Sequence, residues 1–285
     1  MRFIKFLIIL LFSLSAGITA YVHISDTNDM VAPEINCSAD IITVSVKDSK
    51  EKMLSFVTAT DKKDGDVTDR IIVESISPFI DKNTAKITYA VCDSENNVTK
   101  LEKDIVFTDY TAPEFSFSQQ QVYYVGSTKV ELLKGVSAYD SIDGDISSRV
   151  VISDSKIDLS QPGIYPVTYS VTTSKGVTSE ITVNAYVYAS RLYEKISLDS
   201  YLVYTDSSNH IRPTDYINEL PSKYFYNDQV LENYKFEIIN NVDYSKEGIH
   251  YITYRLTYID PYNEYAEPMV IAEAYLAVAV RGENK

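Results

Sequence analysis

Residues 61–68, with the sequence DKKDGDVT, recur about 80 residues later as residues 140–147, with the sequence DSIDGDIS. A second pair repeats at a similar distance, because residues 87–91 (ITYAV) correspond to residues 167–171 (VTYSV). Repetition at a fixed period indicates an array of small domains, so the unit to be explained is a module of about 80 residues.

A third copy of the repeat lacks the acidic turn. Residues 242–256 align without a gap to residues 157–171, although they contain no Asp-Gly-Asp sequence nearby. The sequence therefore predicts three modules, which we place at residues 32–109, 112–189 and 195–281.

Alternation of apolar and polar residues predicts the secondary structure of each module. In residues 87–91, 167–171 and 251–256 every second residue is apolar, and many are β-branched or aromatic. This pattern is typical of a strand with one buried face. Turn signals such as Pro162-Gly163 and Lys175-Gly176 separate the strands at the short intervals of a sandwich. We therefore expect an all-β fold of small antiparallel β-sandwiches.

The acidic repeat follows the pattern D-x-x-D-G-D-[VI]-[TS], and together with the T-Y strand it resembles the bacterial immunoglobulin-like surface modules related to the hyalin repeat. Module two matches most of that pattern, module one matches the turn and the strand, and module three matches only the strand. The resemblance implies tandem immunoglobulin-like sandwiches that are extracellular and usually non-catalytic. Since such modules bind many different molecules, the resemblance names no ligand.

The N-terminus carries an export signal. Arg2 and Lys5 precede an uncharged apolar segment at residues 6–22, as in a secretory signal. Two outcomes remain open: residues 1–25 are removed as a signal peptide, or the apolar helix is retained as a membrane anchor, because its length approaches that of a bilayer span. The predicted location is extracellular or at the cell surface, with membrane contact only through this segment if it stays uncleaved.

Charge and motifs exclude several functions. The chain has 26 Lys and Arg against 40 Asp and Glu, for a net charge of -14. Without a basic patch, nucleic acid is not expected as a partner. None of His23, His210 and His250 lies in a nucleophile or zinc-ligand motif. We therefore predict that the chain is not an enzyme and carries no cofactor other than the structural calcium considered below.

Two cysteines, Cys37 and Cys92, both lie in module one. In an oxidising compartment a disulfide between them would close a loop of about 55 residues and stabilise the module by restricting the unfolded chain. Buried free thiols are the alternative. The export signal favours the disulfide.

The acidic turns have the side chains that calcium binds. In a sandwich of this kind the turn, the last hairpin and the linker meet at one pole, and calcium requires about six to eight oxygen ligands. The candidate ligands are Asp61, Asp64, Asp66, Asp93, Asp109, Asp140, Asp143 and Asp145. Alternatively, these carboxylates cap the turns and pair with the arginines that follow. The capping alternative is favoured, because the full ligand set is not secured in both modules.

Tyrosine is concentrated in the last third of the chain, where 16 of the 24 tyrosines fall between Tyr186 and Tyr275. Some of them continue the inward positions of the repeated strand and should be core. Others lie beside proline and asparagine in turn-like sequence, where an aromatic ring with a hydroxyl suits a protein surface or a sugar face. The candidate contact residues are Tyr224, Tyr226, Tyr262 and Tyr265. Codon bias of the source is the alternative explanation of the excess.

These observations predict a non-enzymatic extracellular or cell-surface protein. Modules one and two would act as an acidic spacer, and module three would present the surface that binds an extracellular protein or glycan. The alternative function is a carbohydrate-binding accessory module of a secreted polysaccharide-handling system.

Overall fold

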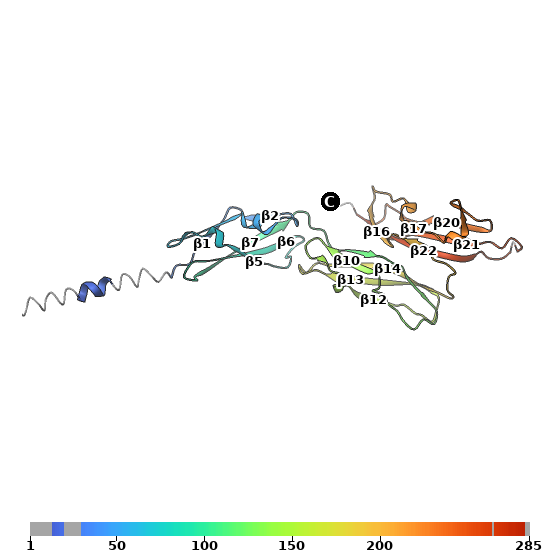
Figure 1. Ribbon diagram of the computed structural model, residues 1–285, viewed down its shortest axis with the longest axis horizontal. Helices are drawn as coiled ribbons and strands as arrows, with labels where there is room; N and C mark the ends of the chain where they lie inside the picture. The colour runs from blue at the N-terminus through green and yellow to red at the C-terminus, as the bar shows by residue number, and fades with distance from the viewer. Residues whose placement is uncertain (1–12, 20–29, 264, 283–285) are drawn as a thin grey trace, which may run out of the picture. The chain divides into compact units, whose positions relative to one another are not determined.

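The computed structural model of the chain describes residues 13–19, 30–263 and 265–282. These residues are built mostly from β-strands in several sheets (Figure 1), which confirms the all-β prediction. The chain divides into two compact units, residues 1–110 and residues 111–285. The first unit contains module one, and the second contains modules two and three.

The predicted export segment at residues 6–22 lies mostly outside the described residues. Residues 13–19 are helical. In the part of the chain that the structure describes, no helix is both long enough and apolar enough to cross a membrane. The choice between a cleaved signal and a retained anchor stays a prediction.

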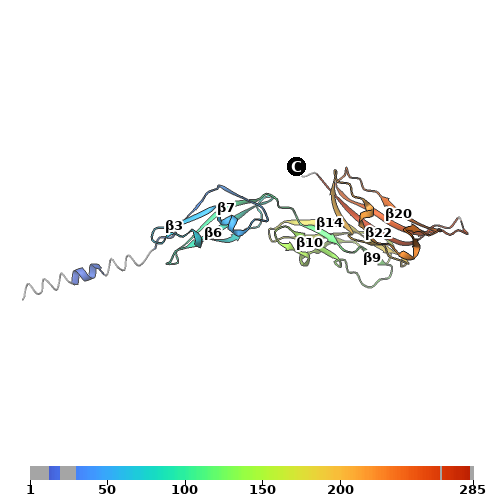
Figure 2. The same cartoon turned by 45° about the horizontal axis from the view of Figure 1, so that its top comes forward.

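Module one consists of two sheets around one core (Figure 2). One sheet has the strand order β1-β3-β4 and the other the order β2-β7-β6-β5. The strands are β1 (Glu34–Cys37), β2 (Ile41–Val44), β3 (Val57–Asp61), β4 (Gly65–Asp66), β5 (Ile72–Ile76), β6 (Thr84–Cys92) and β7 (Val98–Phe107). Two short helical turns, α2 (Lys50–Leu54) and η1 (Thr68–Arg70), complete the module.

The inward face of β6 follows the predicted alternation. Ala85, Ile87 and Tyr89 are all fully buried. The Tyr89 hydroxyl crosses the core and donates a hydrogen bond of 2.8 Å to the carbonyl of Met53. The ring therefore contributes apolar contact while its single polar group is satisfied.

One strand pair in each module departs from the antiparallel prediction. In module one β2 runs parallel to β7, and in module two the corresponding strand runs parallel to the last strand. The cause is that the chain passes from one sheet to the other between β1 and β2 without reversing direction. The opening segment thus pairs antiparallel with β3 and then, as β2, parallel with β7.

Module two repeats this architecture strand for strand, with sheets of order β11-β10-β8 and β12-β13-β14-β9. Its elements are β8 (Glu114–Phe117), β9 (Gln121–Tyr124), β10 (Val136–Asp140), β11 (Gly144–Asp145), η2 (Ser147–Arg149), β12 (Val151–Ser155), β13 (Gly163–Thr172) and β14 (Thr178–Tyr188). Tyr169 occupies the place of Tyr89, and its hydroxyl bonds to the carbonyl of Leu132 at 2.8 Å.

Module three keeps the four-stranded sheet and replaces the three-stranded one. The sheet has the order β16-β22-β21-β20, and β16 again pairs parallel with the last strand. Two small sheets complete the module, namely the pair β15-β17 and the hairpin β18-β19. The elements are β15 (Ser197–Leu198), β16 (Leu202–Asp206), η3 (Pro213–Tyr216), β17 (Ile217–Glu219), η4 (Ser222–Tyr224), β18 (Phe225–Tyr226), β19 (Gln229–Val230), β20 (Tyr234–Asn240), β21 (Gly248–Tyr258) and β22 (Met269–Arg281).

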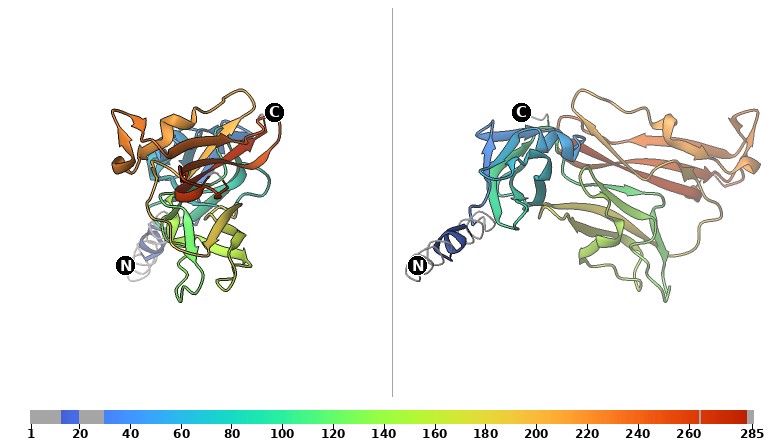
Figure 3. Two further views of the ribbon diagram at one scale, coloured as in Figure 1. Left: turned by 90° about the vertical axis from the view of Figure 1, so that its right-hand side faces the viewer. Right: turned by 60° about the vertical axis from the view of Figure 1, so that its left-hand side comes forward.

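Modules two and three form a single compact unit with one continuous hydrophobic core (Figure 3). Outward-facing side chains of β14 meet outward-facing side chains of β22, and the rings of Tyr186 and Tyr275 stack at 3.8 Å between centroids with an interplanar angle of 5°. The edges are joined as well, since the amide of Tyr201 bonds to the carbonyl of Phe117 at 2.9 Å. Module two therefore covers one face of module three.

Candidate binding surfaces

The carboxylates of the module-one turn accept hydrogen bonds from the turn itself. Asp61 Oδ1 accepts from the amides of Lys63 and Asp64 at 2.8 Å each. Asp64 accepts from the hydroxyl of Ser94 and from Arg70, and these two partners hold the pKa of Asp64 below its usual range. The turn is thereby tied to the hairpin between β6 and β7. Asp66 accepts from the amide of Thr68, the first residue of η1, and Asp93 accepts from the amides of Glu95 and Asn97 in the hairpin.

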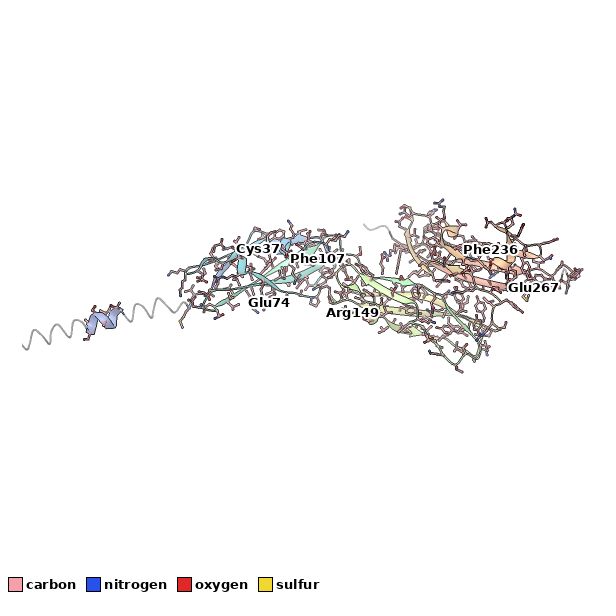
Figure 4. The ribbon with its side chains drawn as sticks, viewed as in Figure 1. Cys37, Glu74, Phe107, Arg149, Phe236 and Glu267 are labelled. Atoms are coloured by element: carbon pink, nitrogen blue, oxygen red, sulfur yellow. The ribbon has the colours of Figure 1, made fainter. Side chains whose placement is uncertain are left out.

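Module two uses the same arrangement. Asp140 Oδ1 accepts from the amides of Ile142 and Asp143 at 2.9 and 2.8 Å. Asp143 pairs with Arg149 and accepts from the amide of Ser174 at 2.6 Å, which joins the turn to the β13–β14 hairpin (Figure 4 labels Arg149). Burial raises the pKa of Asp143, but its hydrogen bonds to Ser174 and Arg149 outweigh burial and lower it.

The remaining acidic candidates are also engaged in local contacts. Asp145 Oδ1 accepts from the amide of Ser147 at 2.9 Å. Asp109 reaches back into module one, where it bonds to the hydroxyl of Ser45 at 2.7 Å and the amide of Val46 at 2.8 Å. No group of three or more acidic, histidine or cysteine side chains able to hold a metal ion occurs among the described residues. The geometry fits the capping alternative, and calcium binding stays an untested prediction.

The predicted disulfide is not formed, because the structure describes Cys37 and Cys92 as free thiols. Cys37 (Figure 4) ends β1, where it continues the inward alternation of Ile35 and packs against the module-one core. Cys92 ends β6 on the outward side of the alternation and is exposed. Cys37 therefore faces the core of module one, whereas Cys92 faces away from it. The spacing of the two cysteines in the sequence did not reveal this difference.

Three of the four candidate contact tyrosines are exposed. Tyr226, Tyr262 and Tyr265 have 72%, 96% and 89% of their surface accessible. Tyr224 differs, because it is half-buried and its ring lies 4.8 Å from that of Tyr234. Tyr224 thus supports the fold of module three more than it presents a surface.

The exposed tyrosines share one end of module three. Tyr226 lies on the β18–β19 hairpin. Leu231, the residue after this hairpin, bonds through its amide to the carbonyl of Tyr224 at 2.9 Å, close to the start of β20. Tyr262 and Tyr265 lie in the connection from β21 to β22, which also carries Glu267 (Figure 4). The same end exposes three aliphatic side chains. We call this surface the aromatic end; it consists of Tyr226, Leu231, Ile259, Tyr262, Tyr265 and Met269.

Another set of tyrosines, not singled out as an interface from the sequence, joins modules two and three. Tyr251 on β21 accepts a hydrogen bond of 2.8 Å from the amide of Asn184 on β14. Burial raises the pKa of the Tyr251 hydroxyl to about 12. A signal for this interface was present, because residues 270–280 (VIAEAYLAVAV) are apolar at nearly every position rather than at alternate ones. A strand covered on both faces has that pattern.

A charged network lies within this interface. Glu273 on β22 is only 5% exposed. It accepts hydrogen bonds from the hydroxyl of Tyr188 at 2.8 Å, from the hydroxyl of Tyr275 and from the guanidinium of Arg255. Burial, reinforced by the charge of Glu273, raises the pKa of the Tyr188 and Tyr275 hydroxyls, so both remain protonated donors. The buried carboxylate is thus fully satisfied across the contact between the modules.

Comparison with known proteins gives one match to a family model. The model described as "Bacterial surface protein, Ig-like domain" matches residues 117–187. Pesticidal crystal protein Cry22Aa from Bacillus thuringiensis is 29% identical over 217 residues, which are 74% of this chain and 28% of that protein. An uncharacterized 81.3 kDa protein of Acholeplasma phage L2 is 26% identical over 184 residues, which are 62% of this chain and 24% of that protein.

The chain therefore spans only 28% and 24% of the length of these two relatives. Among solved structures, CBM51-2 in complex with GlcNAc and INT domains from Clostridium perfringens ZmpB is 37% identical with a TM-score of 0.25, covering 27% of this chain and 17% of that one. On the family match, the resemblance to bacterial surface immunoglobulin-like modules is confirmed for the second module.

Proposed function

We propose that this chain is a non-enzymatic protein of the bacterial surface or extracellular medium, built from tandem immunoglobulin-like modules, that binds an extracellular partner protein through its aromatic end. The observation that carries the proposal is the exposure of Tyr226, Tyr262 and Tyr265 at one end of one module. Exposed apolar clusters of this kind mark interaction sites, and tyrosine is enriched among residues that dominate binding.

The absence of catalysis belongs to the same proposal. His210 stacks on Tyr244 at 4.0 Å, and His250 bonds through Nε2 to the carbonyl of Lys246 at 2.9 Å. Both described histidines thus make structural contacts. The third, His23, lies outside the described residues. Location at the surface is supported by the family match of module two and by the predicted export signal.

The test is a binding screen with a matched control. The chain is passed over a panel of immobilised extracellular proteins, and each binder is measured again with the double variant Tyr262→Ser, Tyr265→Ser. Loss of one dominant tyrosine costs about 2 kcal/mol or more, so we expect Kd to rise at least about 30-fold. Tyr193→Ser is the control, because Tyr193 is 66% exposed but lies outside the aromatic end. Binding that the double variant retains would contradict the proposal.

The second candidate is carbohydrate binding. A single observation favours it, namely a groove with hydroxyl and carboxylate groups between modules two and three. The groove is remote from the aromatic end along β22, so the two functions are separable by mutation.

A further inference from the structure

An open groove of about 670 Å³ lies where the outer face of the β11-β10-β8 sheet meets strand β16. The sheet belongs to module two and β16 to module three, so both modules are needed to form the groove. Tyr204 on β16 fixes the junction, because its hydroxyl accepts a hydrogen bond of 3.0 Å from the amide of Phe115. The guanidinium of Arg281 covers the Tyr204 ring at 3.8 Å and pairs with Glu114.

The floor of the groove is an exposed tyrosine between two carboxylates. Tyr139 on β10 stands directly opposite Glu114 on β8 and directly opposite Asp145 on β11. Directly opposed side chains in a sheet have Cβ atoms about 5 Å apart, so both carboxylates flank the ring. Tyr139 is 63% exposed, which leaves its ring open to a ligand.

Two hydroxyls continue the floor along the same face. Ser116 and Ser137 are paired across β8 and β10, and their Oγ atoms lie 2.7 Å apart. Ser137 is two residues from Tyr139 on the same strand, and side chains two apart point to the same face about 7 Å from each other. Asp145 receives both of its hydrogen bonds from Ser147 on Oδ1. The floor therefore combines a ring, carboxylates and hydroxyls over a short distance.

This combination fits a ligand rich in hydroxyl groups and free of negative charge. Carboxylates accept hydrogen bonds from hydroxyl donors, and an ionised acceptor makes the stronger kind of bond. A tyrosine ring supplies apolar area with few torsions to immobilise, which suits the flat face of a sugar ring. Because Arg281 offsets the charge of Glu114, an anionic ligand would be repelled mainly by Asp145 and by the net charge of -14.

A peptide fits the floor less well than a sugar. Peptides that bind sheets as an added strand need a free strand edge. Here β10 is hydrogen-bonded to β8 on one side and to β11 on the other. The outer edge of β8 is occupied by module three, because the amide of Phe115 bonds to the Tyr204 hydroxyl and the carbonyl of Phe117 accepts from the amide of Tyr201.

Module one provides an internal comparison. At the equivalent positions it keeps both carboxylates, Glu34 and Asp66, opposite the same residue of β3. That residue is Thr60 instead of tyrosine. The two acids thus occur in both modules, whereas the aromatic ring and the wall from β16 occur at module two.

We propose that this groove binds an uncharged oligosaccharide, with Tyr139 against a sugar ring and with Asp145 and Glu114 accepting hydrogen bonds from its hydroxyls. The proposal does not rest on the aromatic end, since no residue is shared between the two surfaces. Either proposal can fail while the other holds.

The experiment is isothermal titration calorimetry of the chain with uncharged hexasaccharides of glucose, mannose, xylose and N-acetylglucosamine. An oligogalacturonate of the same length serves as the anionic probe, and a lysine-rich hexapeptide as the peptide probe. We expect at least one uncharged hexasaccharide to bind, and Tyr139→Thr to weaken that binding about tenfold or more. Tyr193→Thr should bind as the unaltered chain does, because Tyr193 is as exposed as Tyr139 but lies outside the groove.

Threonine is compatible with the fold at this position, since Thr60 occupies it in module one. Equal melting temperatures of Tyr139→Thr and the unaltered chain would exclude loss of fold as the cause of weaker binding. Three outcomes overturn the proposal: none of the uncharged hexasaccharides binds at millimolar concentration, only the anionic or peptide probe binds, or Tyr139→Thr binds as tightly as the unaltered chain.

Discussion

Replacing Glu273 by glutamine should separate the energetic roles of shape and charge where modules two and three meet. The substitution keeps the size of the side chain but exchanges one carboxylate oxygen for an amide donor. In the structure all three partners of Glu273 are donors, namely Tyr188, Tyr275 and Arg255. A tyrosine hydroxyl can turn to accept from the new amide group, whereas Arg255 can only donate to the remaining oxygen, so the hydrogen bonds can be kept but the charge that strengthens them is lost.

The expected cost follows from burial. Hydrogen bonds to a charged group contribute about 1.5 to 3 kcal/mol, and breaking a fully buried ion pair costs about 3 to 5 kcal/mol. Glu273 is 5% exposed, but the side chain of Arg255 is 37% exposed and keeps part of its hydration. The upper figures therefore do not apply, and we expect Glu273→Gln to destabilise the second unit by about 2 kcal/mol. For a unit of this size that corresponds to a melting temperature lower by about 4 to 8 °C.

The assay is differential scanning calorimetry of the chain. The transition of residues 111–285 should move, whereas that of module one should stay and acts as an internal reference. Glu131→Gln is the matched control, because Glu131 pairs with Lys129 at 2.7 Å on an exposed surface. Such a surface pair contributes about 0 to 1 kcal/mol. Equal shifts for the two variants, or a shift of module one, would refute the assignment of Glu273 as a buried link between the modules.

Three further predictions follow from the same contacts. Residues 111–285 should unfold in one cooperative transition, whereas a fragment of residues 190–285 should lose cooperativity in circular dichroism melts, because removal of module two uncovers its tyrosine face. The melting temperature should be the same in calcium and in chelator, and Asp143→Asn should lower it equally in both, because that carboxylate already accepts hydrogen bonds; a shift of several degrees on adding calcium would instead establish a metal site. Thiol titration should find two free cysteines, with Cys92 reacting in the folded chain before Cys37; no free thiol in the unfolded, unreduced chain would show the disulfide.

The alternation of apolar and polar residues within single strands was sufficient to predict the core residues of each module. The repeated T-Y motif placed one tyrosine per module in the core, and in the structure each is fully buried with its hydroxyl on a backbone carbonyl. These residues are Tyr89, Tyr169 and Tyr254. Alternation is set within one strand by the two faces of the sheet, so a few residues determine which side chains point inward.

The outer faces could not be predicted in the same way. Asn184, Tyr186 and Tyr188 alternate with the core residues of β14 and so have the pattern of a solvent-facing row. Whether another module covers that row depends on contacts between residues far apart in the sequence. The alternation within one strand does not report such contacts. The exception is a strand that is apolar on both faces, as β22 is, because that pattern indicates that both faces are covered.

The tyrosines of module three fall into three groups: those in its core, those that contact module two, and those of the aromatic end. The aromatic end and the groove lie at opposite ends of strand β22. Met269, at the start of β22, belongs to the aromatic end, and Arg281, at its end, borders the groove. A strand of 13 residues at about 3.3 Å per residue separates them by roughly 40 Å. At that distance, without shared partners, the effects of substitutions should add. Tyr139→Thr should thus leave protein binding at the aromatic end unchanged, and coupling between the two surfaces above about 0.5 kcal/mol would contradict their independence.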